Sequence, residues 1–178
     1  YSIGTVGAGN HFVELQYIDE FYEEDTCESH GVVPGLVYCL VHSGSRGLGE
    51  AILTDVLDKN GPGGLQESSD YFQDYISAHN EACKWAFSNR SLIVKRLFDL
   101  MNTSATLIHD CSHNYLEQIE VDGQLSWIHR KGASPVSPNL LAIPGSRGTH
   151  TYLVRIVGDA RESLYSIAHG AGRKFSRK

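Results

Sequence analysis

One histidine of this chain stands directly before a glycine- and serine-rich loop that could bind phosphate. His42 follows an apolar run, Leu36 to Val41, and precedes Ser43-Gly44-Ser45-Arg46-Gly47. The run has the length of a buried strand and a helix is expected to start near Glu50, so the loop would offer free backbone N–H groups and the positive end of a helix dipole. Arg46 adds a planar fork that matches phosphate. The stretch indicates either a phosphate cradle or an ordinary strand-to-helix turn with a surface arginine.

A second histidine, His11, follows the glycine-rich segment Gly4-Thr5-Val6-Gly7-Ala8-Gly9-Asn10. This segment resembles a dinucleotide-binding loop, but such a loop needs a strand before it and a helix after it. Here the next residues, 12–17, alternate as a strand does. Period-2 alternation would place Asn10 and Glu14 on one face and His11 on the other. His11 is therefore a candidate ligand, with a structural role as the alternative.

Two further histidines, His113 and His169, stand in comparable settings. Residues 106–115 are predicted to form a strand with His109, Cys111 and His113 on one face. His169 lies in a turn of small residues beside basic ones. Histidines with oxygen ligands suit Zn, Mn or Fe, and spacing does not choose among these metals. A site would have to be assembled from distant strands, because the sequence has no compact CxxC signature.

Composition fits one globular domain that acts inside the cell. The chain has 178 residues, 41% of them hydrophobic, and no apolar run of the roughly 18 residues that a membrane span needs. Four cysteines without a disulfide-like framework indicate a reducing, cytoplasmic setting. The net charge of −6 is uneven: residues 1–128 hold 6 basic and 19 acidic residues, whereas 129–178 hold 9 and 2. The basic C-terminal part could contact a polyanion, although a solvated face is the plainer interpretation.

Periodicity and turn signals predict the other elements. Residues 19–29 should form an exposed acidic loop, and 58–69 a second loop. Helices are expected over 47–57 and 70–101, the second capped by Ser69 or Asp70 and broken near Ser88-Asn89. On that helix His79 and Cys83 could chelate a metal, but their apolar neighbours favour core packing. Strands are expected on both sides of a turn at 121–124, and over 140–143 and 152–157.

Taken together and in order, the motifs resemble the RtcB family of RNA ligases. They are GTVGAGNHFVELQ, VHSGSRGLG, HDCSHN, HRKGA, IPGSRG and AHGAGR. The resemblance runs from Gly4 to Lys178, and the HRKGA and PGSRG forms are closer to a shorter, divergent bacterial branch. It implies an α+β fold with mixed or antiparallel sheets and helices packed around a central metal and nucleotide cleft. It also implies a single ligase domain over residues 1–178, incomplete at the N-terminus and at the C-terminus.

The activity implied by the resemblance joins an RNA 3′-phosphate or 2′,3′-cyclic phosphate end to a 5′-hydroxyl end. Such enzymes act in RNA repair or tRNA splicing, use GTP and two Mn²⁺ ions, and pass through a guanylyl-histidine intermediate. A cytoplasmic monomer with no membrane association is expected. Two other functions stay open: a metal-dependent phosphoesterase acting on RNA ends, and a non-catalytic RNA-binding remnant.

The resemblance also implies a role for individual residues. His169 would be the guanylylated nucleophile, and His11, His42 and His113 would bind manganese. Arg46, Arg130 and Arg173 are candidates for holding RNA phosphates. The residues implied to line the nucleotide site are Asn10, Phe12, Glu14, Asn114, Pro144, Gly145, Ser146, Arg147, Thr151, Gly170, Ala171 and Gly172.

Part of the family's site has no counterpart in this sequence. The family's Asp and Cys metal ligands belong to a DxGC-type motif that would precede residue 1, and its guanine-binding lysine would follow Lys178. Cys111 stands in a different motif and is predicted to be structural. The manganese site would therefore be only partly supplied by these residues, and the activity of this segment alone is doubtful.

Overall fold

The computed structural model describes residues 2–136, 140–146 and 148–170. The chain divides into two compact units, Tyr1–Ile108 and His109–Lys178, each of which is described by itself. Both contain antiparallel sheets, and helices of more than one turn occur in the first unit among the described residues. These elements agree with the predicted α+β class. None of the helices described is long and apolar enough to cross a bilayer.

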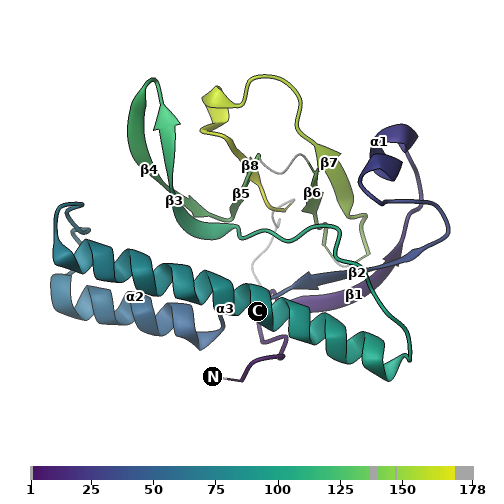
Figure 1. Ribbon diagram of the computed structural model, residues 1–178, viewed down its shortest axis with the longest axis horizontal. Helices are drawn as coiled ribbons and strands as arrows, with labels where there is room; N and C mark the ends of the chain where they lie inside the picture. Colours follow the sequence, from purple (N-terminus) through teal and green to yellow (C-terminus); the bar gives the residue numbers. More distant parts are fainter. Residues whose placement is uncertain (1, 137–139, 147, 171–178) are drawn as a thin grey trace. The chain divides into compact units, whose positions relative to one another are not determined.

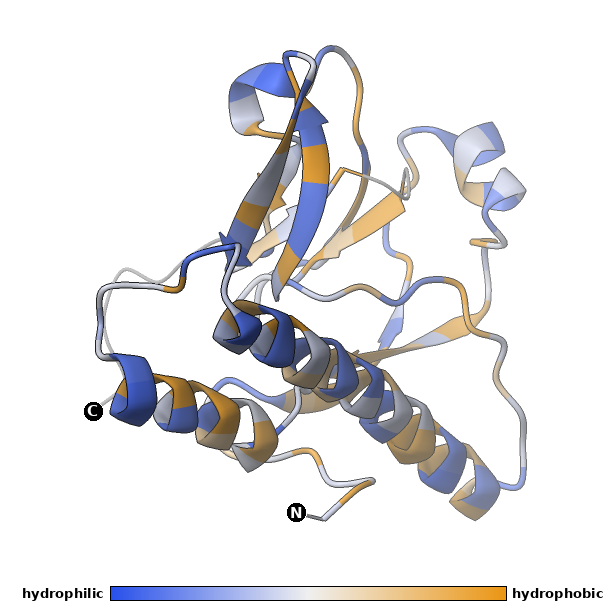
Figure 2. Ribbon diagram, turned by 60° about the vertical axis from the view of Figure 1, so that its left-hand side comes forward, coloured by the Kyte–Doolittle hydropathy of each residue, from blue (hydrophilic) through white to orange (hydrophobic). Residues whose placement is uncertain are grey.

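The first unit combines a two-stranded sheet with a pair of helices (Figure 1). Its elements are β1 (Phe12–Tyr17), α1 (Glu24–Ser29), β2 (Val37–His42), α2 (Gly47–Asn60) and α3 (Asp70–Leu100). Helix α3 packs against both α2 and β2. Both long helices carry hydrophilic as well as hydrophobic residues around their circumference, as Figure 2 shows.

Helix α3 is one continuous helix of 31 residues. Ser69 caps it, with its side chain accepting from the backbone N–H of Phe72 at 3.2 Å, as predicted. The expected break near Ser88-Asn89 is wrong. Instead, Asn89 lies on the buried face of the helix, which also carries Ala82, Ala86 and Ile93. A polar residue can stay in a continuous helix when its side chain finds partners outside the helix.

Strands β1 and β2 pair antiparallel, with Phe12 opposite His42 and Tyr17 opposite Val37. The alternating pattern of residues 12–17 is thus confirmed as a strand. The acidic stretch before β2 is not only a loop, because residues 24–29 form the short helix α1. Glu24 and Asp25 lie in its first turn, where negative side chains favour the helix dipole.

The second unit is built from short antiparallel pairs. Its elements are β3 (Asn114–Val121), β4 (Gln124–Lys131), β5 (Ala133–Pro135), β6 (Leu140–Ile143), β7 (Tyr152–Arg155), a 3₁₀ turn (Arg161–Ser163) and β8 (Ser166–Ala168). The pairs are β3–β4, β5–β8 and β6–β7. Asp122 and Gly123 both have positive φ, 50° and 77°, which fits the predicted tight hairpin turn.

The expected strand over 106–115 is wrong for most of its length. Among the described residues the strand begins at Asn114, and 106–113 form neither strand nor helix. Alternation in a short segment does not make a strand unless another strand pairs with it. The buried core of the second unit includes Leu140 and Leu141, together with the polar Ser134 and Arg130.

Candidate functional site

His11 and His42 approach each other at one end of the β1–β2 sheet. His42 is the last residue of β2, and His11 directly precedes β1. The centroids of the two rings are 6.0 Å apart, and the ring of Phe12 is 5.3 Å from that of His42. The structure therefore brings together two of the three predicted metal ligands within the first unit.

Arg46, the residue directly before α2, contacts His11. Its Nη1 lies 3.3 Å from Nδ1 of His11. Its backbone φ of 58° belongs to a region that residues other than glycine rarely adopt, and such strain often accompanies functional positions. The guanidinium also occupies the space that a side chain at position 7 would need, which explains Gly7.

The pKa of His11 is lowered, first by burial and then by the positive charge of Arg46. Its imidazole is therefore neutral at pH 7. A neutral imidazole is the form that binds a divalent metal. This property, and the nearby ring of His42, fit the expected metal-binding role. Arg46 reaches His11 in this structure, and its role in holding phosphate stays a prediction.

In the second unit His169 is fixed by the backbone of Gly132. The Nδ1 atom of His169 lies 2.7 Å from the carbonyl oxygen of Gly132, and the backbone N–H of His169 donates to the same oxygen at 3.2 Å. A carbonyl oxygen only accepts, so Nδ1 must carry the proton. In the neutral ring Nε2 then has its lone pair available, which is the form a nucleophile needs.

Gly132 is required at this place for two reasons. Its φ is +72°, which glycine adopts without strain. A Cβ there would stand 3.3 Å from both Nδ1 and Cε1 of His169, closer than side chains normally pack. Glycine therefore suits both the backbone conformation and the close approach of the histidine ring.

His113 and Asn114 support the same turn. The backbone N–H of Gly132 lies 2.8 Å from the carbonyl oxygen of His113 and 2.7 Å from Oδ1 of Asn114. The ring of His113 stacks on that of His169, with centroids 4.0 Å apart. The predicted nucleophile, one predicted metal ligand and one predicted nucleotide-binding residue are thus neighbours in the second unit.

Arg130 is buried and bonded within the second unit, which argues against the predicted role in holding RNA phosphate. Its side chain is only 2% exposed. All three of its nitrogens donate within the unit: Nε to Ser166 Oγ at 2.9 Å, Nη1 to Tyr115 and Glu117, and Nη2 to the carbonyl oxygen of Tyr165 at 3.3 Å. The guanidinium also lies over the Tyr115 ring, 5.3 Å from its centroid. Its role is to tie β8 and the preceding turn to the β3–β4 hairpin.

Tyr115 shares the buried surroundings of Arg130. Burial is the main cause that raises the pKa of its phenol to about 12, with Arg130 acting in the opposite direction and Glu117 adding to the increase. The phenol therefore stays neutral throughout the physiological range.

The loop that follows β6 closes tightly on itself. The carbonyl oxygen of Ser146 accepts from the backbone N–H of Thr149 at 2.9 Å and from its hydroxyl at 2.8 Å. A Cβ on Gly145 would overlap with Thr149, so this position also needs glycine. A Cβ on Gly170 would lie 3.6 Å from the carbonyl oxygen of Pro144. Two segments predicted to bind nucleotide are therefore adjacent.

For the other predicted residues that it describes, the structure gives burial or local contacts. Asn10 and Glu14 are exposed, and Glu14 accepts from Gln16 at 3.0 Å. Thr151 is half-buried. Four predicted residues lie outside the described part of the chain: Arg147, Ala171, Gly172 and Arg173.

Several residues that position these histidines were not predicted from the sequence. Gly132 stood within the HRKGA motif, and its neighbour in that motif, Arg130, was assigned to RNA instead. Asn89 and Ser43 are both buried, whereas the sequence predicts a helix break at Asn89 and a loop at Ser43. The burial of Asn89 could have been predicted from its position as a polar residue within the apolar stripe of the helix.

The fold and these residues define an α+β protein with paired histidines beside glycine-rich turns. The family model described as tRNA-splicing ligase RtcB matches residues 1–178, and the chain belongs to the RtcB family. It is 41% identical over 176 residues to the RNA-splicing ligase RtcB2 of Escherichia coli. The matched region covers 99% of this chain and 46% of that protein.

Archaeal proteins named tRNA-splicing ligase RtcB are also similar to the chain. The identity is 35% for the Thermococcus kodakarensis protein, over 99% of this chain and 45% of the relative. It is 34% for the Methanococcus maripaludis protein, over 98% and 45%. The chain thus spans a little under half the length of these relatives.

Proposed function

We propose that the protein containing this chain joins RNA 3′-phosphate or 2′,3′-cyclic phosphate ends to 5′-hydroxyl ends, using GTP and Mn²⁺, in RNA repair or tRNA splicing. Membership of the RtcB family supports RNA ligation. The observation that carries the proposal is the hydrogen bond between His169 Nδ1 and Gly132, which directs the lone pair of the ring to Nε2. We expect the protein to act as a monomer in the cytoplasm.

His169 acts as the nucleophile in this proposal. Its Nε2 attacks the α-phosphorus of GTP, a nitrogen–phosphorus bond forms, and pyrophosphate leaves. An oxygen of the RNA 3′-phosphate then attacks the same phosphorus, which releases the histidine and activates the RNA end. The 5′-hydroxyl finally attacks the RNA phosphorus, and GMP leaves. A cyclic phosphate end must first be opened by water.

His11, His42 and His113 are the proposed manganese ligands of this chain. The lowered pKa of His11 and its proximity to His42 fit that role. Bound Mn²⁺ would neutralise phosphate charge and align attacking oxygens. Cys111 lies 3.7 Å from Ser134 Oγ, which supports the prediction that it is structural.

The proposed nucleotide-binding residues include those around His169. The adjacency of Pro144 and Gly170 supports this assignment, as does the contact of Asn114 with Gly132. The proposed set is Asn10, Phe12, Glu14, Asn114, Pro144, Gly145, Ser146, Arg147, Thr151, Gly170, Ala171 and Gly172. Arg46 and Arg173 remain the proposed contacts for RNA phosphate.

Labelling of the full-length protein with GTP carrying a radioactive α-phosphate tests the nucleophile. With Mn²⁺ present, the parent should acquire a covalent label, and the His169→Ala variant should acquire none. His129→Ala is a matched control, because His129 is an exposed histidine on β4 of the same unit. Equal labelling of the His169→Ala variant and the parent would refute the assignment.

The same experiment separates the two alternatives. A phosphoesterase would remove a cyclic phosphate from RNA without GTP and without any covalent label. An RNA-binding remnant would bind RNA in a salt-sensitive manner, with neither label nor turnover.

A further inference from the structure

Asn89 is a completely buried polar residue in the middle of α3. Its exposed fraction is 0%, and its neighbours on the same helix face, Ala86 and Ile93, are buried and apolar. Burying an amide without hydrogen bonds costs free energy of about 1–3 kcal/mol in proteins. The presence of Asn89 on this face therefore requires partners from outside the helix.

The side chain of Asn89 uses its full hydrogen-bonding capacity. Its Oδ1 accepts from the backbone N–H of Gly4 at 2.7 Å and of Thr5 at 3.1 Å. Its Nδ2 donates to the carbonyl oxygen of Thr5 and to Oγ of Ser43, each at 3.1 Å. An amide side chain has two donors and an oxygen with two lone pairs, so these four bonds satisfy it.

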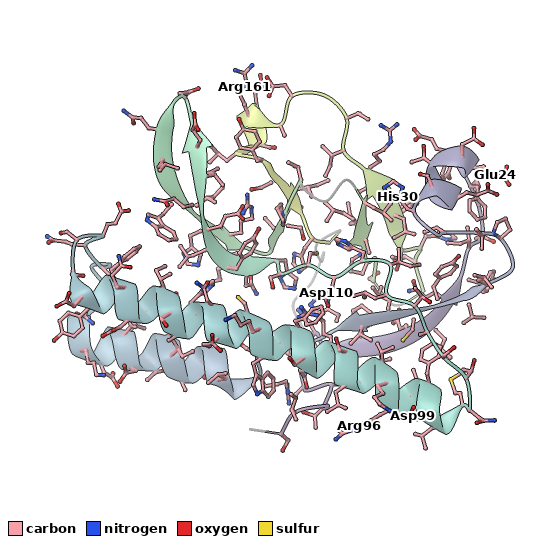
Figure 3. The ribbon with its side chains drawn as sticks, in the orientation of Figure 1. Glu24, His30, Arg96, Asp99, Asp110 and Arg161 are labelled. Atoms are coloured by element: carbon pink, nitrogen blue, oxygen red, sulfur yellow. The ribbon has the colours of Figure 1, made fainter. Side chains whose placement is uncertain are left out.

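Other bonds reinforce the same junction. Ser43 Oγ donates to the carbonyl oxygen of Val6 at 2.7 Å. Arg90, the next residue of α3, donates to the carbonyl oxygen of Ser43 at 2.9 Å. Arg96, labelled in Figure 3 on the C-terminal half of α3, donates to the carbonyl oxygen of Gly4 at 2.7 Å. One helix therefore holds two segments that are distant in the sequence.

Both segments lead directly to the proposed metal ligands. Ser43 is the residue after His42, and the Gly4–Val6 segment continues through the glycine loop to His11. The two rings are 6.0 Å apart. Residues 2–11 form neither helix nor strand. Their position therefore depends on side-chain contacts such as those of Asn89.

We propose that Asn89 is a positioning residue that fixes the Gly4–Val6 segment against Ser43 and thereby sets the spacing of the His11 and His42 imidazoles for a divalent metal. This inference rests on the proposed function, in which these two histidines bind Mn²⁺. Asn89 acts through the two segments and touches neither imidazole in its bonded contacts.

The Asn89→Asp variant tests the proposal with almost no change in shape. Its carboxylate can still accept from Gly4 and Thr5, but it cannot donate to the carbonyl oxygen of Thr5 or to Ser43. Mn²⁺ binding to the GTP-free full-length protein is measured by the electron paramagnetic resonance signal of free Mn²⁺. We expect the dissociation constant to rise about ten-fold, as when groups that orient metal ligands are lost.

Asn80→Asp is the matched control, because Asn80 is an exposed residue of the same helix and the substitution adds the same charge. Its Mn²⁺ affinity should equal that of the parent. Thermal unfolding of each variant shows whether it is folded at the assay temperature. At saturating Mn²⁺ we expect folded Asn89→Asp protein to regain most of the parental GTP labelling, which a loss of folded protein alone would not allow.

Ser43→Ala provides a milder variant in case Asn89→Asp does not fold. It removes one partner of Asn89 and should weaken Mn²⁺ binding in the same direction by a smaller factor. A folded variant of either kind with a dissociation constant within two-fold of the parent overturns the role of Asn89. A parent that binds no Mn²⁺ overturns the proposed metal site and this inference together. A parent that binds Mn²⁺ but takes no label from GTP refutes only the proposed ligase mechanism.

Discussion

The two units hold their histidines by different means. In the first unit side chains do so: Asn89, Ser43 and Arg90 connect α3 to the segments that carry His11 and His42. In the second unit the backbone does so, because the carbonyl oxygen of Gly132 accepts from both the ring and the backbone N–H of His169.

This difference determines which substitutions can disturb each pair. A side-chain connection is lost when one polar residue is replaced, although the surrounding helix persists. A backbone connection cannot be removed by substitution, and it is disturbed only when a new side chain pushes the strand away. Gly132 is the position where that can happen in the second unit.

Gly132→Ala should have the largest effect on the proposed chemistry after replacement of His169 itself. The new Cβ would stand 3.3 Å from the ring of His169 and would strain a backbone with a φ of +72°. Relieving this contact needs a shift of a few tenths of an ångström at the reacting ring, so we expect a loss of GTP labelling that stays below the roughly 100-fold cost of a 1 Å displacement.

Gly123→Ala separates the effect of backbone strain from the effect of the contact with the His169 ring. Gly123 has a φ of +77° in the β3–β4 turn, and a Cβ there would meet nothing within 4 Å. Both variants should lose about 1–2 kcal/mol of stability through backbone strain. Only Gly132→Ala should lose labelling. Equal loss of labelling in the two variants would contradict a specific role for the contact with His169.

Arg130→Met should mainly destabilise the second unit. The substitution removes a buried cation. The side-chain oxygens of Glu117, Tyr115 and Ser166 then lose the donor that Arg130 provides. Breaking a buried ion pair in this way typically costs about 3–5 kcal/mol, and the partial exposure of Glu117 places the expected loss near the lower figure. Denaturant unfolding of the full-length protein measures it.

Lys131→Met is the control for the loss of charge, since Lys131 is the next residue of β4 and is exposed. Its stability should change by no more than about 0.5 kcal/mol. The slope of log RNA affinity against log salt concentration reports the number of phosphate contacts. If this slope fell by about one contact in folded Arg130→Met protein, Arg130 would bind RNA after all.

The smallest expected effect concerns Tyr115. The pKa of its phenol is raised to about 12 in the folded chain, mainly by burial, whereas a phenol in an unfolded chain has a pKa of about 10. Between these values the unfolded state loses its proton first, so stability falls as the pH rises from about 10 towards 12. Alkaline titration followed by phenolate absorbance should show one phenol that titrates at about pH 12 in the parent and is missing in the Tyr115→Phe variant. Loss of a component that titrates at about pH 10 instead would contradict the raised pKa.

Much of the secondary structure could be predicted because it depends on local signals. The period-2 pattern of β1, the apolar stripe of α3 with its Ser69 cap, and the Asp122-Gly123 turn each act over a few residues. The wrong predictions concern segments whose structure is determined by contacts between residues far apart in the sequence. Residues 106–113 found no pairing strand, and Asn89 was kept within a continuous helix by partners 46, 84 and 85 residues away.

The candidate site shows the same division. The motifs identified the four histidines, and the structure brings them together as two pairs, each within one unit. The residues that hold them were not identified, because a buried asparagine and a close glycine carry no motif of their own. The burial of Arg130 was not predicted, because charge in a sequence does not reveal burial.

The junction at Asn89 has a consequence for the exchange of backbone protons with solvent. The amide protons of Gly4 and Thr5 belong to a segment without regular structure, yet both are bonded to a completely buried oxygen of α3. They can exchange with solvent only when the segment separates from the helix. These two amides should therefore share the slow exchange of the helix interior rather than the fast exchange typical of an irregular segment.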